Sequence, residues 1–219
     1  MRFLVIIPAF NEALKIKEVI SDLRNVGLND ILVIDDGSKD DTFRIAESLG
    51  IKTLRHQVNR GQGAAIKTGM VLALREDYEA IVFFDADGQM SAQEIRNFID
   101  KLKEGYEVVL GSRNLGRVID MPLIKKITKK LALIFTVVIS GLKLTDTHNG
   151  FQAWRTSALK KINLRQDRFA YASELLNEIS RLNLKYIEIP VCIKYTDYSR
   201  SKGQKISGLF KILWDLLIK

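Results

Sequence analysis

Residues 81–90 read IVFFDADGQM, an apolar run that leads directly into two carboxylates with one residue between them. Side chains at positions i and i+2 of an extended chain point the same way, so Asp85 and Asp87 converge. Two bare carboxylates at this spacing repel, and one tends to take up a proton. Gly88 allows a sharp turn, and Gln89 adds an amide oxygen. The three oxygen-bearing side chains suit Mg²⁺ or Mn²⁺ with positions left for a substrate phosphate.

An Asp-X-Asp pair is also common at solvated strand ends and in turns, so the motif indicates a metal site only together with other features. A calcium-binding EF-hand loop is excluded. That loop needs Gly where this chain has Met90, and Glu where it has Arg96.

The first half of the chain alternates between strand and helix patterns. Apolar, β-branched runs predict strands, and segments with one apolar face predict helices. The predicted strands are 2–7, 30–35, 52–56, 80–85 and 107–112; the predicted helices are about 12–25, 39–50, 61–76 and 91–105, the last with Ser91 and Glu94 as a capping box. Strict alternation predicts an α/β fold, with a mostly parallel, Rossmann-like sheet and helices on both faces.

Polar clusters follow three of these strands, namely Asn11–Glu12, Asp35–Asp36 and Asp85–Asp87. Ligands of parallel sheets bind at the carboxyl ends of the strands, so the clusters predict one shared nucleotide pocket. The stretch NRGQGAAIKTG (59–69) is a weak dinucleotide fingerprint, because Ile66 replaces its third Gly. A glycine-rich helix start still allows close approach to phosphates or close packing on the sheet.

After Ser112 the pattern changes. Residues 122–144 predict a long helix that starts with lysines, and its apolar part, 131–139, is shorter than the roughly 20 residues that span a bilayer. Further predictions are a functional loop at 145–155, a helix at about 172–182, strands at 185–190 and 191–196, a basic loop at 198–205 and a C-terminal amphipathic helix whose apolar stripe is Ile206, Leu209, Phe210, Leu213, Leu216 and Leu217. We expect a single domain over 1–219, divided functionally at 111/112.

Net charge and cysteine content limit the binding partners and the cellular compartment that we expect for this protein. The net charge of +8 divides into −4 over residues 1–111 and +12 over 112–219, so the second half is expected to meet something anionic. No nucleic-acid motif accompanies the basic half, so nucleic-acid binding is disfavoured. A single cysteine, Cys192, excludes an internal disulfide and fits a buried strand in a reduced compartment. The N-terminus reaches Pro8 too soon for a signal peptide. His56 and His148 are too isolated to predict a metal pair.

Seven stretches together resemble the family 2 glycosyltransferases with the GT-A fold, and among them the dolichyl- and polyprenyl-phosphate hexose synthases. They occur in the family's order and are IIPAFNE (6–12), VIDDGSKDDT (33–42), NRGQGAAIKTG (59–69), FFDADGQM (83–90), VVLGSR (108–113), TDTHNGFQAWR (145–155) and YSRSKGQ (198–204). Each stretch alone is modest evidence, and the ordered set is highly specific.

The resemblance implies a role for each matching residue. The donor, a nucleoside diphosphate sugar such as GDP-mannose or a UDP-hexose, would be bound by Pro8, Phe10, Glu12, Asp36, Asp85, Ala86, Asp87, Arg113, Arg200 and Lys202. Asp85, Asp87 and Gln89 would hold Mg²⁺ or Mn²⁺ on its diphosphate. Asp87, Arg113 and Asp146 would form the catalytic group, with Asp146 orienting or weakly basic. Phe10 departs from the usual Tyr, which removes a hydroxyl and keeps the ring.

The expected reaction is an inverting transfer of a hexose to a polyprenyl phosphate. We expect the protein to be cytoplasmic and peripheral at the inner face of the membrane, held there by lysines 125, 126, 129 and 130 and by the C-terminal stripe. A soluble or cell-envelope sugar acceptor is the alternative. A noncatalytic membrane-surface module would not need DADGQ, and a sugar-nucleotide pyrophosphorylase would carry a Gly- and Arg-rich loop where PAFNE (8–12) stands.

Overall fold

The computed structural model describes residues 1–119, 133, 136–137, 140–147, 149–195 and 198. Its strands are β1 (Phe3–Ala9), β2 (Ile31–Asp35), β3 (Lys52–Arg55), β4 (Ala80–Phe83), β5 (Val108–Ile119), β6 (Gln152–Arg155) and β7 (Tyr186–Lys194). Its helices are α1 (Ile16–Asn25), α2 (Thr42–Ser48), α3 (Gln62–Arg75), α4 (Ile95–Lys103), α6 (Thr156–Leu159) and α7 (Tyr171–Arg181), with a 3₁₀ turn, η1 (Ala92–Glu94), before α4.

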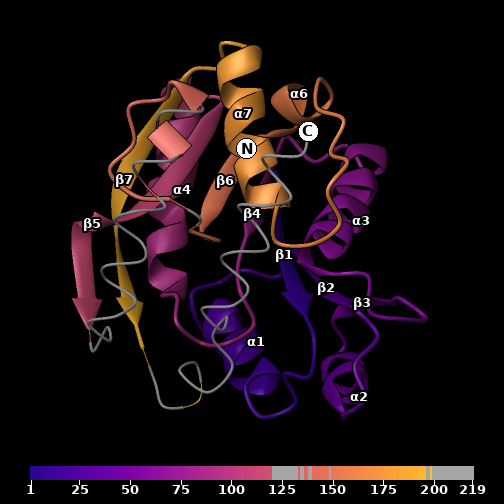
Figure 1. Cartoon of the computed structure of the whole chain (residues 1–219). Coiled ribbons are helices and arrows are strands. Elements are labelled where there is room, and N and C mark those ends of the chain that lie inside the picture. Colours follow the sequence, from indigo (N-terminus) through magenta and orange to yellow (C-terminus); the bar gives the residue numbers. More distant parts are fainter. Residues whose placement is uncertain (120–132, 134–135, 138–139, 148, 196–197, 199–219) are drawn as a thin grey trace.

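The strands form one sheet in the order β3-β2-β1-β4-β6-β5-β7 (Figure 1). The pairs β1–β2, β1–β4, β2–β3 and β5–β7 are parallel, and β6 runs antiparallel to both of its neighbours. The predicted mostly parallel sheet is therefore confirmed. The first residues of the second half belong to it, because β5 continues across position 112 without leaving the sheet.

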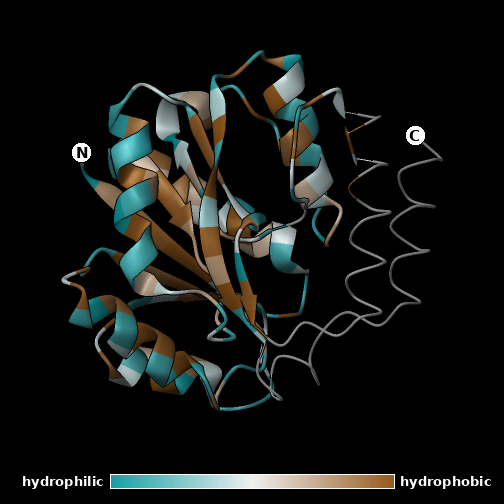
Figure 2. Cartoon of the chain, turned by 90° about the vertical axis from the view of Figure 1, so that its left-hand side faces the viewer, coloured by the Kyte–Doolittle hydropathy of each residue, from teal (hydrophilic) through white to brown (hydrophobic). Residues whose placement is uncertain are grey.

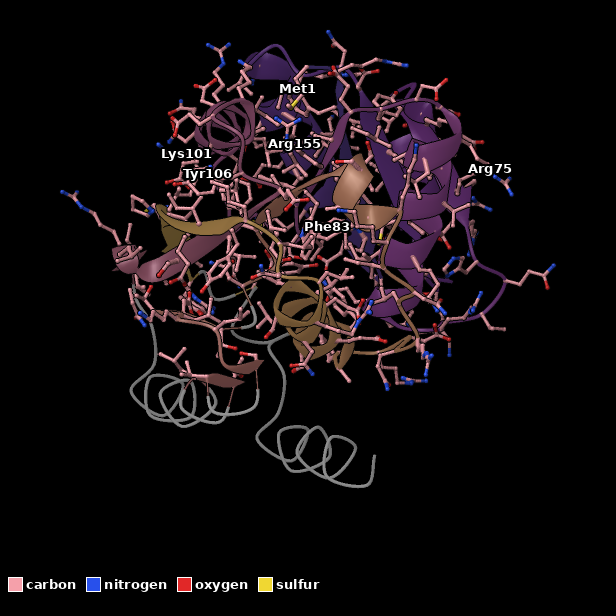
Figure 3. All side chains as sticks on the ribbon, turned by 90° about the horizontal axis from the view of Figure 1, so that it is seen from above. Met1, Arg75, Phe83, Lys101, Tyr106 and Arg155 are labelled. Atoms are coloured by element: carbon pink, nitrogen blue, oxygen red, sulfur yellow. The ribbon has the colours of Figure 1, made fainter. Side chains whose placement is uncertain are left out.

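Helices cover both faces of the sheet, as the strand–helix alternation predicts. The side chains of α1, α2 and α4 pack on one face, and those of α3, α6 and α7 on the other. Figure 2 shows the result: hydrophobic residues concentrate in the sheet, and the outer sides of the helices are hydrophilic. Phe83 on β4, 2% exposed, lies in the middle of the molecule when it is seen from above (Figure 3). Burial of this apolar surface on two sides stabilises the three layers.

Helix α1 begins at Ile16 and not near Glu12, as the sequence pattern predicts. Asn11 has a left-handed backbone, with φ of 56°. Its N–H donates to Ser38 Oγ at 2.8 Å, and the Glu12 N–H donates to Thr42 Oγ1 at 2.7 Å. These bonds and the left-handed backbone of Asn11 keep Asn11 and Glu12 out of the helix, so Glu12 lies in the loop between β1 and α1.

The last four residues of the stretch predicted as a functional loop, 145–155, instead form strand β6 in the interior of the sheet. Trp154 is fully buried there, and its indole N–H donates to Gln152 Oε1 at 3.0 Å. A four-residue strand is too short for its periodicity to stand out from a loop.

The other edge of the sheet differs from the prediction in two ways. Strand β5 runs to Ile119 and not to Ser112, and β7 is one strand instead of two. Pro190 lies within β7, opposite Ser112, where the register of the pair shifts. A proline donates no ladder hydrogen bond, and an edge strand with a bulge tolerates that loss.

The predicted capping box at Ser91 and Glu94 is wrong. The side chain of Ser91 caps nothing, and the Glu94 carboxylate accepts a hydrogen bond from the Cys192 N–H at 2.9 Å. Cys192 lies in β7, as predicted, but it is only half-buried. Glu94 therefore ties the start of α4 to the sheet edge.

The long helix predicted over 122–144 is described at Leu133, Thr136, Val137 and Ser140, which are helical. Residues 141–144 are not, because Gly141 turns the chain with φ of 67°. The lysines at 125–130 and the stripe of 206–217 lie outside the described residues. Within the described ranges, no helix is both long and apolar enough to pass through a membrane.

Candidate active site

The predicted polar strand ends meet in one cleft of about 600 Å³ at the carboxyl edge of the sheet. Its lining consists of Pro8, Ala9, Phe10, Asn11, Glu12, Asp36, Asn59, Gly61, Gln62, Ala65, Asp85, Ala86, Asp87, Gln89, Arg168 and Phe169. Eight predicted site residues are in this set: Pro8, Phe10, Glu12, Asp36, Asp85, Ala86, Asp87 and Gln89. The strand order explains the convergence, because β1 lies between β2 and β4 and all three strands run the same way.

The carboxylate pair sits in the turn after β4. Gly88, with φ of 72°, turns the chain, and the Gln89 N–H donates to Asp87 Oδ1 at 3.1 Å. Gln62 Nε2 at the start of α3 donates to Asp85 Oδ1 at 3.0 Å. Burial, and next the charge of Asp87, raise the pKa of Asp85 to about 7. The turn thus concentrates negative charge where a cation or a proton is needed.

These residues fit a divalent metal that is completed by its ligand. In the part of the chain that the structure describes, no group of three or more His, Cys, Asp or Glu could enclose a metal ion. Asp85, Asp87 and the amide of Gln89 offer two carboxylates and one neutral oxygen. Mg²⁺ binds in this way, through one or two carboxylates with the remaining positions filled by water and substrate phosphate.

We expect metal affinity to fall as the pH drops below 7. The raised pKa means that Asp85 holds a proton below about pH 7, and a metal must displace that proton. Calorimetric titration with Mn²⁺ should show affinity that drops roughly ten-fold per pH unit below that point and levels off above it. Runs in two buffers of different ionisation heat should show release of about one proton per metal at low pH. An affinity independent of pH would contradict the raised pKa.

Gly150 leaves room for the Asp85 carboxylate. A Cβ atom on Gly150 would lie 2.5 Å from Asp85 Oδ2, closer than any real contact of that kind. The neighbouring Asn149 is anchored to β5, because its Nδ2 donates to the Gly111 carbonyl at 2.8 Å. The backbone at Gly150 therefore forms one wall of the carboxylate site.

Gly150→Ala is expected to displace the Asp85 carboxylate and to lower activity about a hundred-fold, the cost of misplacing a catalytic group by roughly 1 Å. Mn²⁺ affinity should fall with it. Gly50→Ala is the matched control: Gly50 has φ of 67° and nothing within 4 Å of its Cβ position. That change should cost about 1–2 kcal/mol of stability from backbone strain and leave activity unchanged. If both variants are equally active, close packing of the Gly150 backbone is not needed to position the Asp85 carboxylate.

Asp36 organises the loop beside the cleft. Its carboxylate accepts hydrogen bonds from the Arg60 N–H at 3.0 Å and the Gly61 N–H at 2.7 Å. His56 Nδ1 lies 2.7 Å from the same carboxylate, and His56 Nε2 lies 3.0 Å from Thr68 Oγ1. His56 is thus a hydrogen-bonded structural residue, and His148 lies outside the described residues.

Arg113 and Asp146, predicted as catalytic, are bonded to each other. Arg113 Nε lies 2.6 Å from Asp146 Oδ2, and its NH2 group lies 2.7 Å from Asp146 Oδ1 and from the Thr147 carbonyl. Both side chains are under 10% exposed, and neither lines the cleft. Arg113 is near enough to lower the pKa of Asp85 against the larger effects that raise it. Their catalytic roles remain a prediction.

Glu188 of β7 holds the loop that carries Asp146. Its carboxylate accepts hydrogen bonds from the Thr145 N–H at 2.7 Å and the Asp146 N–H at 3.1 Å. Burial raises the pKa of Glu188. No pattern around Glu188 in the sequence predicts this contact, because it joins residues 42 and 43 positions apart.

Arg200 and Lys202, the predicted donor-closing pair, lie outside the described residues. Tyr198, which begins that stretch, is described, and its hydroxyl donates to Glu12 Oε2 at 2.7 Å. The chain therefore reaches the rim of the cleft at the first residue of the predicted loop.

The residues around the site that the sequence did not predict include Gln62, Arg168 and Phe169 in the cleft lining and Gly150 beside Asp85. Gln62 and Gly150 stand inside motifs that were noticed, NRGQG and THNGF, but their contacts with Asp85 depend on folding. Arg168 and Phe169 follow no motif. They lie about 80 positions after the carboxylate pair and reach the cleft only through the packing of their loop on α3.

A mixed α/β/α sandwich with acidic strand ends around one cleft is the architecture of the GT-A-type glycosyltransferases. The sequence profile described as glycosyl transferase family 2 matches residues 4–163, and the chain belongs to this family.

Relatives and solved structures agree with that assignment. The chain is 33% identical to a UDP-N-acetylglucosamine–dolichyl-phosphate N-acetylglucosaminyltransferase of Methanococcus voltae, over 98% of this chain and 94% of the relative. It is 27% identical to an undecaprenyl-phosphate mannosyltransferase of Micrococcus luteus, over 92% and 87% of the two chains. Glucosyl-3-phosphoglycerate synthase of Mycobacterium tuberculosis, solved with Mn²⁺ and UDP-glucose, has the same fold: the TM-score is 0.76 at 16% identity, covering 99% of this chain and 76% of that one.

Proposed function

We propose that this glycosyltransferase moves a hexose or N-acetylhexosamine from a nucleoside diphosphate sugar to a polyprenyl phosphate. The convergence of three acidic strand ends on one cleft carries the donor half of the proposal. The names of the relatives, which act on dolichyl or undecaprenyl phosphate, support the acceptor half. The charge of +12 over residues 112–219 suits an anionic lipid acceptor.

We assign different residues of the cleft to different parts of the donor. Pro8, Phe10, Glu12 and Asp36 line the part next to β1 and β2, where we place the nucleoside. Asp85, Asp87 and Gln89 would hold Mg²⁺ or Mn²⁺ on the diphosphate. A bound metal ion would neutralise charge that develops on the leaving nucleoside diphosphate.

A lipid phosphate acceptor does not require a general base to activate it. A lipid phosphate is ionised at neutral pH and can attack the anomeric carbon directly, from the side opposite the leaving group, with inversion. The engagement of both Asp146 carboxylate oxygens by Arg113 supports this route, because a general base must be able to reach the proton it removes. We assign Asp146 an orienting role. Arg113 would then bind phosphate only after a change in this ion pair.

A soluble acceptor is the second candidate. The structural neighbour named above acts, by its name, on phosphoglycerate, which also carries a phosphate. The two candidates differ in their need for a membrane surface. The lipid proposal puts the protein at the inner face of the membrane, held by the lysines at 125–130 and the stripe of 206–217.

The first experiment is a screen of nucleoside diphosphate sugars by thermal shift. One donor is expected to raise the melting temperature in the presence of Mn²⁺ and not in its absence, because ligand that binds only the folded state stabilises it. Asp87→Ala should show no shift with the same donor. If no UDP- or GDP-sugar shifts the wild-type protein with Mn²⁺ present, the donor half of the proposal fails.

Membrane binding is expected to depend on salt. Each lysine near an anionic surface contributes on the order of 1 kcal/mol, and salt screens this attraction. Co-sedimentation with anionic vesicles should therefore weaken as salt rises, and weaken further when Leu209, Phe210 and Leu213 are made polar. Folded protein that stays in solution with such vesicles at low salt would favour the soluble acceptor.

A further inference from the structure

Among the described residues, the charged side chains that line the cleft are mostly acidic. Four carboxylates, of Glu12, Asp36, Asp85 and Asp87, line it, and a single basic side chain, Arg168, faces them among the lining residues. A nucleoside diphosphate or a lipid phosphate brings further negative charge. A cation at this place would lower the cost of bringing these charges together.

The guanidinium N–H groups of Arg168 are available to bind a ligand. Within the described residues its guanidinium makes no hydrogen bond or ion pair, and its side chain is exposed. The other arginines near the cleft are engaged: Arg113 with Asp146 at 2.6 Å, Arg55 with Asp35 at 3.0 Å and Arg60 with Asp167 at 3.5 Å. An arginine presents five N–H donors in a planar fork that matches phosphate oxygens.

The loop that carries Arg168 is fastened to α3. Asp167 pairs with Lys67 at 3.1 Å and with Arg60 at 3.5 Å, and its carbonyl accepts a hydrogen bond from the Ala64 N–H at 2.9 Å. The bond from Lys67 lowers the pKa of Asp167. On the other side, the Glu174 carboxylate accepts from the backbone N–H groups that begin the loop, at 2.8–3.0 Å. The loop thus has anchors at both ends.

Two glycines of the NRGQG stretch make this contact possible. A Cβ atom on Gly61 would lie 2.5 Å from the Asp167 carbonyl oxygen and 2.9 Å from Arg168 Cγ, and one on Gly63 would lie 2.4 Å from the Gln166 carbonyl oxygen. Only glycine lets the chain approach this closely. The stem of Arg168 therefore lies along Gly61, whose N–H bonds to Asp36 in the wall of the cleft.

We propose that Arg168 binds a phosphate group of a substrate in the cleft, and that the pairing of Asp167 with α3 positions it there. The inference rests on the proposed function, because that function supplies the phosphate. The donor diphosphate and the acceptor phosphate are two sources of the same chemistry, and separate measurements distinguish them.

The test compares Arg168→Ala, Arg168→Lys and a matched control, Arg165→Ala. Arg165 is exposed on the same loop but does not line the cleft, and it bonds to Glu174 through its backbone N–H. Calorimetry with UDP and GDP in the presence of Mn²⁺ measures the donor side, and the KM for a polyprenyl phosphate measures the acceptor side. Loss of a charged hydrogen bond predicts ~10- to 100-fold weaker binding for Arg168→Ala. Arg168→Lys should recover part of the loss, and Arg165→Ala should behave as wild type.

The outcomes separate the two proposals. Weaker nucleotide binding assigns Arg168 to the donor diphosphate, and a raised KM for the lipid with normal nucleotide binding assigns it to the acceptor. If Arg168→Ala keeps both values, or if Arg165→Ala loses as much, the assignment of Arg168 is overturned. If the wild-type protein binds neither UDP nor GDP with Mn²⁺ and transfers no sugar, the proposed function itself fails.

Discussion

Asp87→Ala is expected to lower sugar transfer by about a thousand-fold. A metal ion held here would stabilise the charge that develops in the transition state by several kcal/mol. Each ~1.36 kcal/mol of that stabilisation corresponds to a factor of ten in rate. Asp87 is half-buried in a turn at the cleft, so its loss opens no cavity in the core. The melting temperature should stay close to that of the wild type, and Mn²⁺ affinity measured by calorimetry should fall with activity.

The control for this variant is Asp100→Ala. Asp100 is an exposed carboxylate on α4, paired with Lys103 at 3.0 Å. Its removal deletes the same charge from the surface and should leave transfer and Mn²⁺ binding unchanged. Chelation by EDTA should reproduce the effect of Asp87→Ala in the wild-type protein. Full activity of the Asp87→Ala variant would refute the metal assignment.

Asp146→Ala is expected to cost about 3–5 kcal/mol of unfolding free energy, because it leaves the Arg113 guanidinium buried without its carboxylate. The pair is 7% and 6% exposed and is bonded through two nitrogen–oxygen contacts of 2.6 and 2.7 Å. Urea denaturation measures the loss. Replacing both partners with apolar residues, Arg113→Met with Asp146→Leu, should recover much of the stability and none of the activity.

The partly exposed pair of Glu178 and Arg181 on α7 supplies the comparison, with Arg181 59% and Glu178 16% exposed. Glu178→Ala should cost under about 1 kcal/mol, since solvent screens such pairs. A loss of the same small size for Asp146→Ala would mean that the buried ion pair contributes little to holding the Asp146 loop against β5. Arg113 would then be available for phosphate without any rearrangement.

The sequence predicted the features that depend on neighbouring residues. The strand ends at Glu12, Asp36 and Asp85 were predicted to converge, because the apolar runs before them are long and the direction of parallel strands brings their carboxyl ends together. Helices with a clear apolar face, such as α4 and α7, were predicted to within a few residues. These are local patterns that tertiary packing reinforces.

The features that were missed depend on contacts between distant residues. Strand β6 is only four residues long and takes its conformation from β4 and β5 on either side. The Glu94 carboxylate accepts a hydrogen bond from Cys192, 98 positions away. This tertiary hydrogen bond forms in place of the predicted local capping box. Arg168 reaches the cleft, and Gly150 reaches the Asp85 carboxylate, through contacts between distant residues that local sequence patterns do not encode. The ion pair between Arg113 and Asp146 joins residues 33 positions apart, and their shared burial could not be inferred from either motif alone.

The most direct test of the account is transfer of labelled sugar to lipid. Purified protein is incubated with Mn²⁺, the donor chosen by the thermal-shift screen and a short polyprenyl phosphate in anionic vesicles, with phosphoglycerate in a parallel reaction. The account predicts labelled lipid whose mass equals that of the polyprenyl phosphate plus one sugar residue, formed by the wild type and not by Asp87→Ala. Label on phosphoglycerate with none on the lipid, at equal donor consumption, would contradict it.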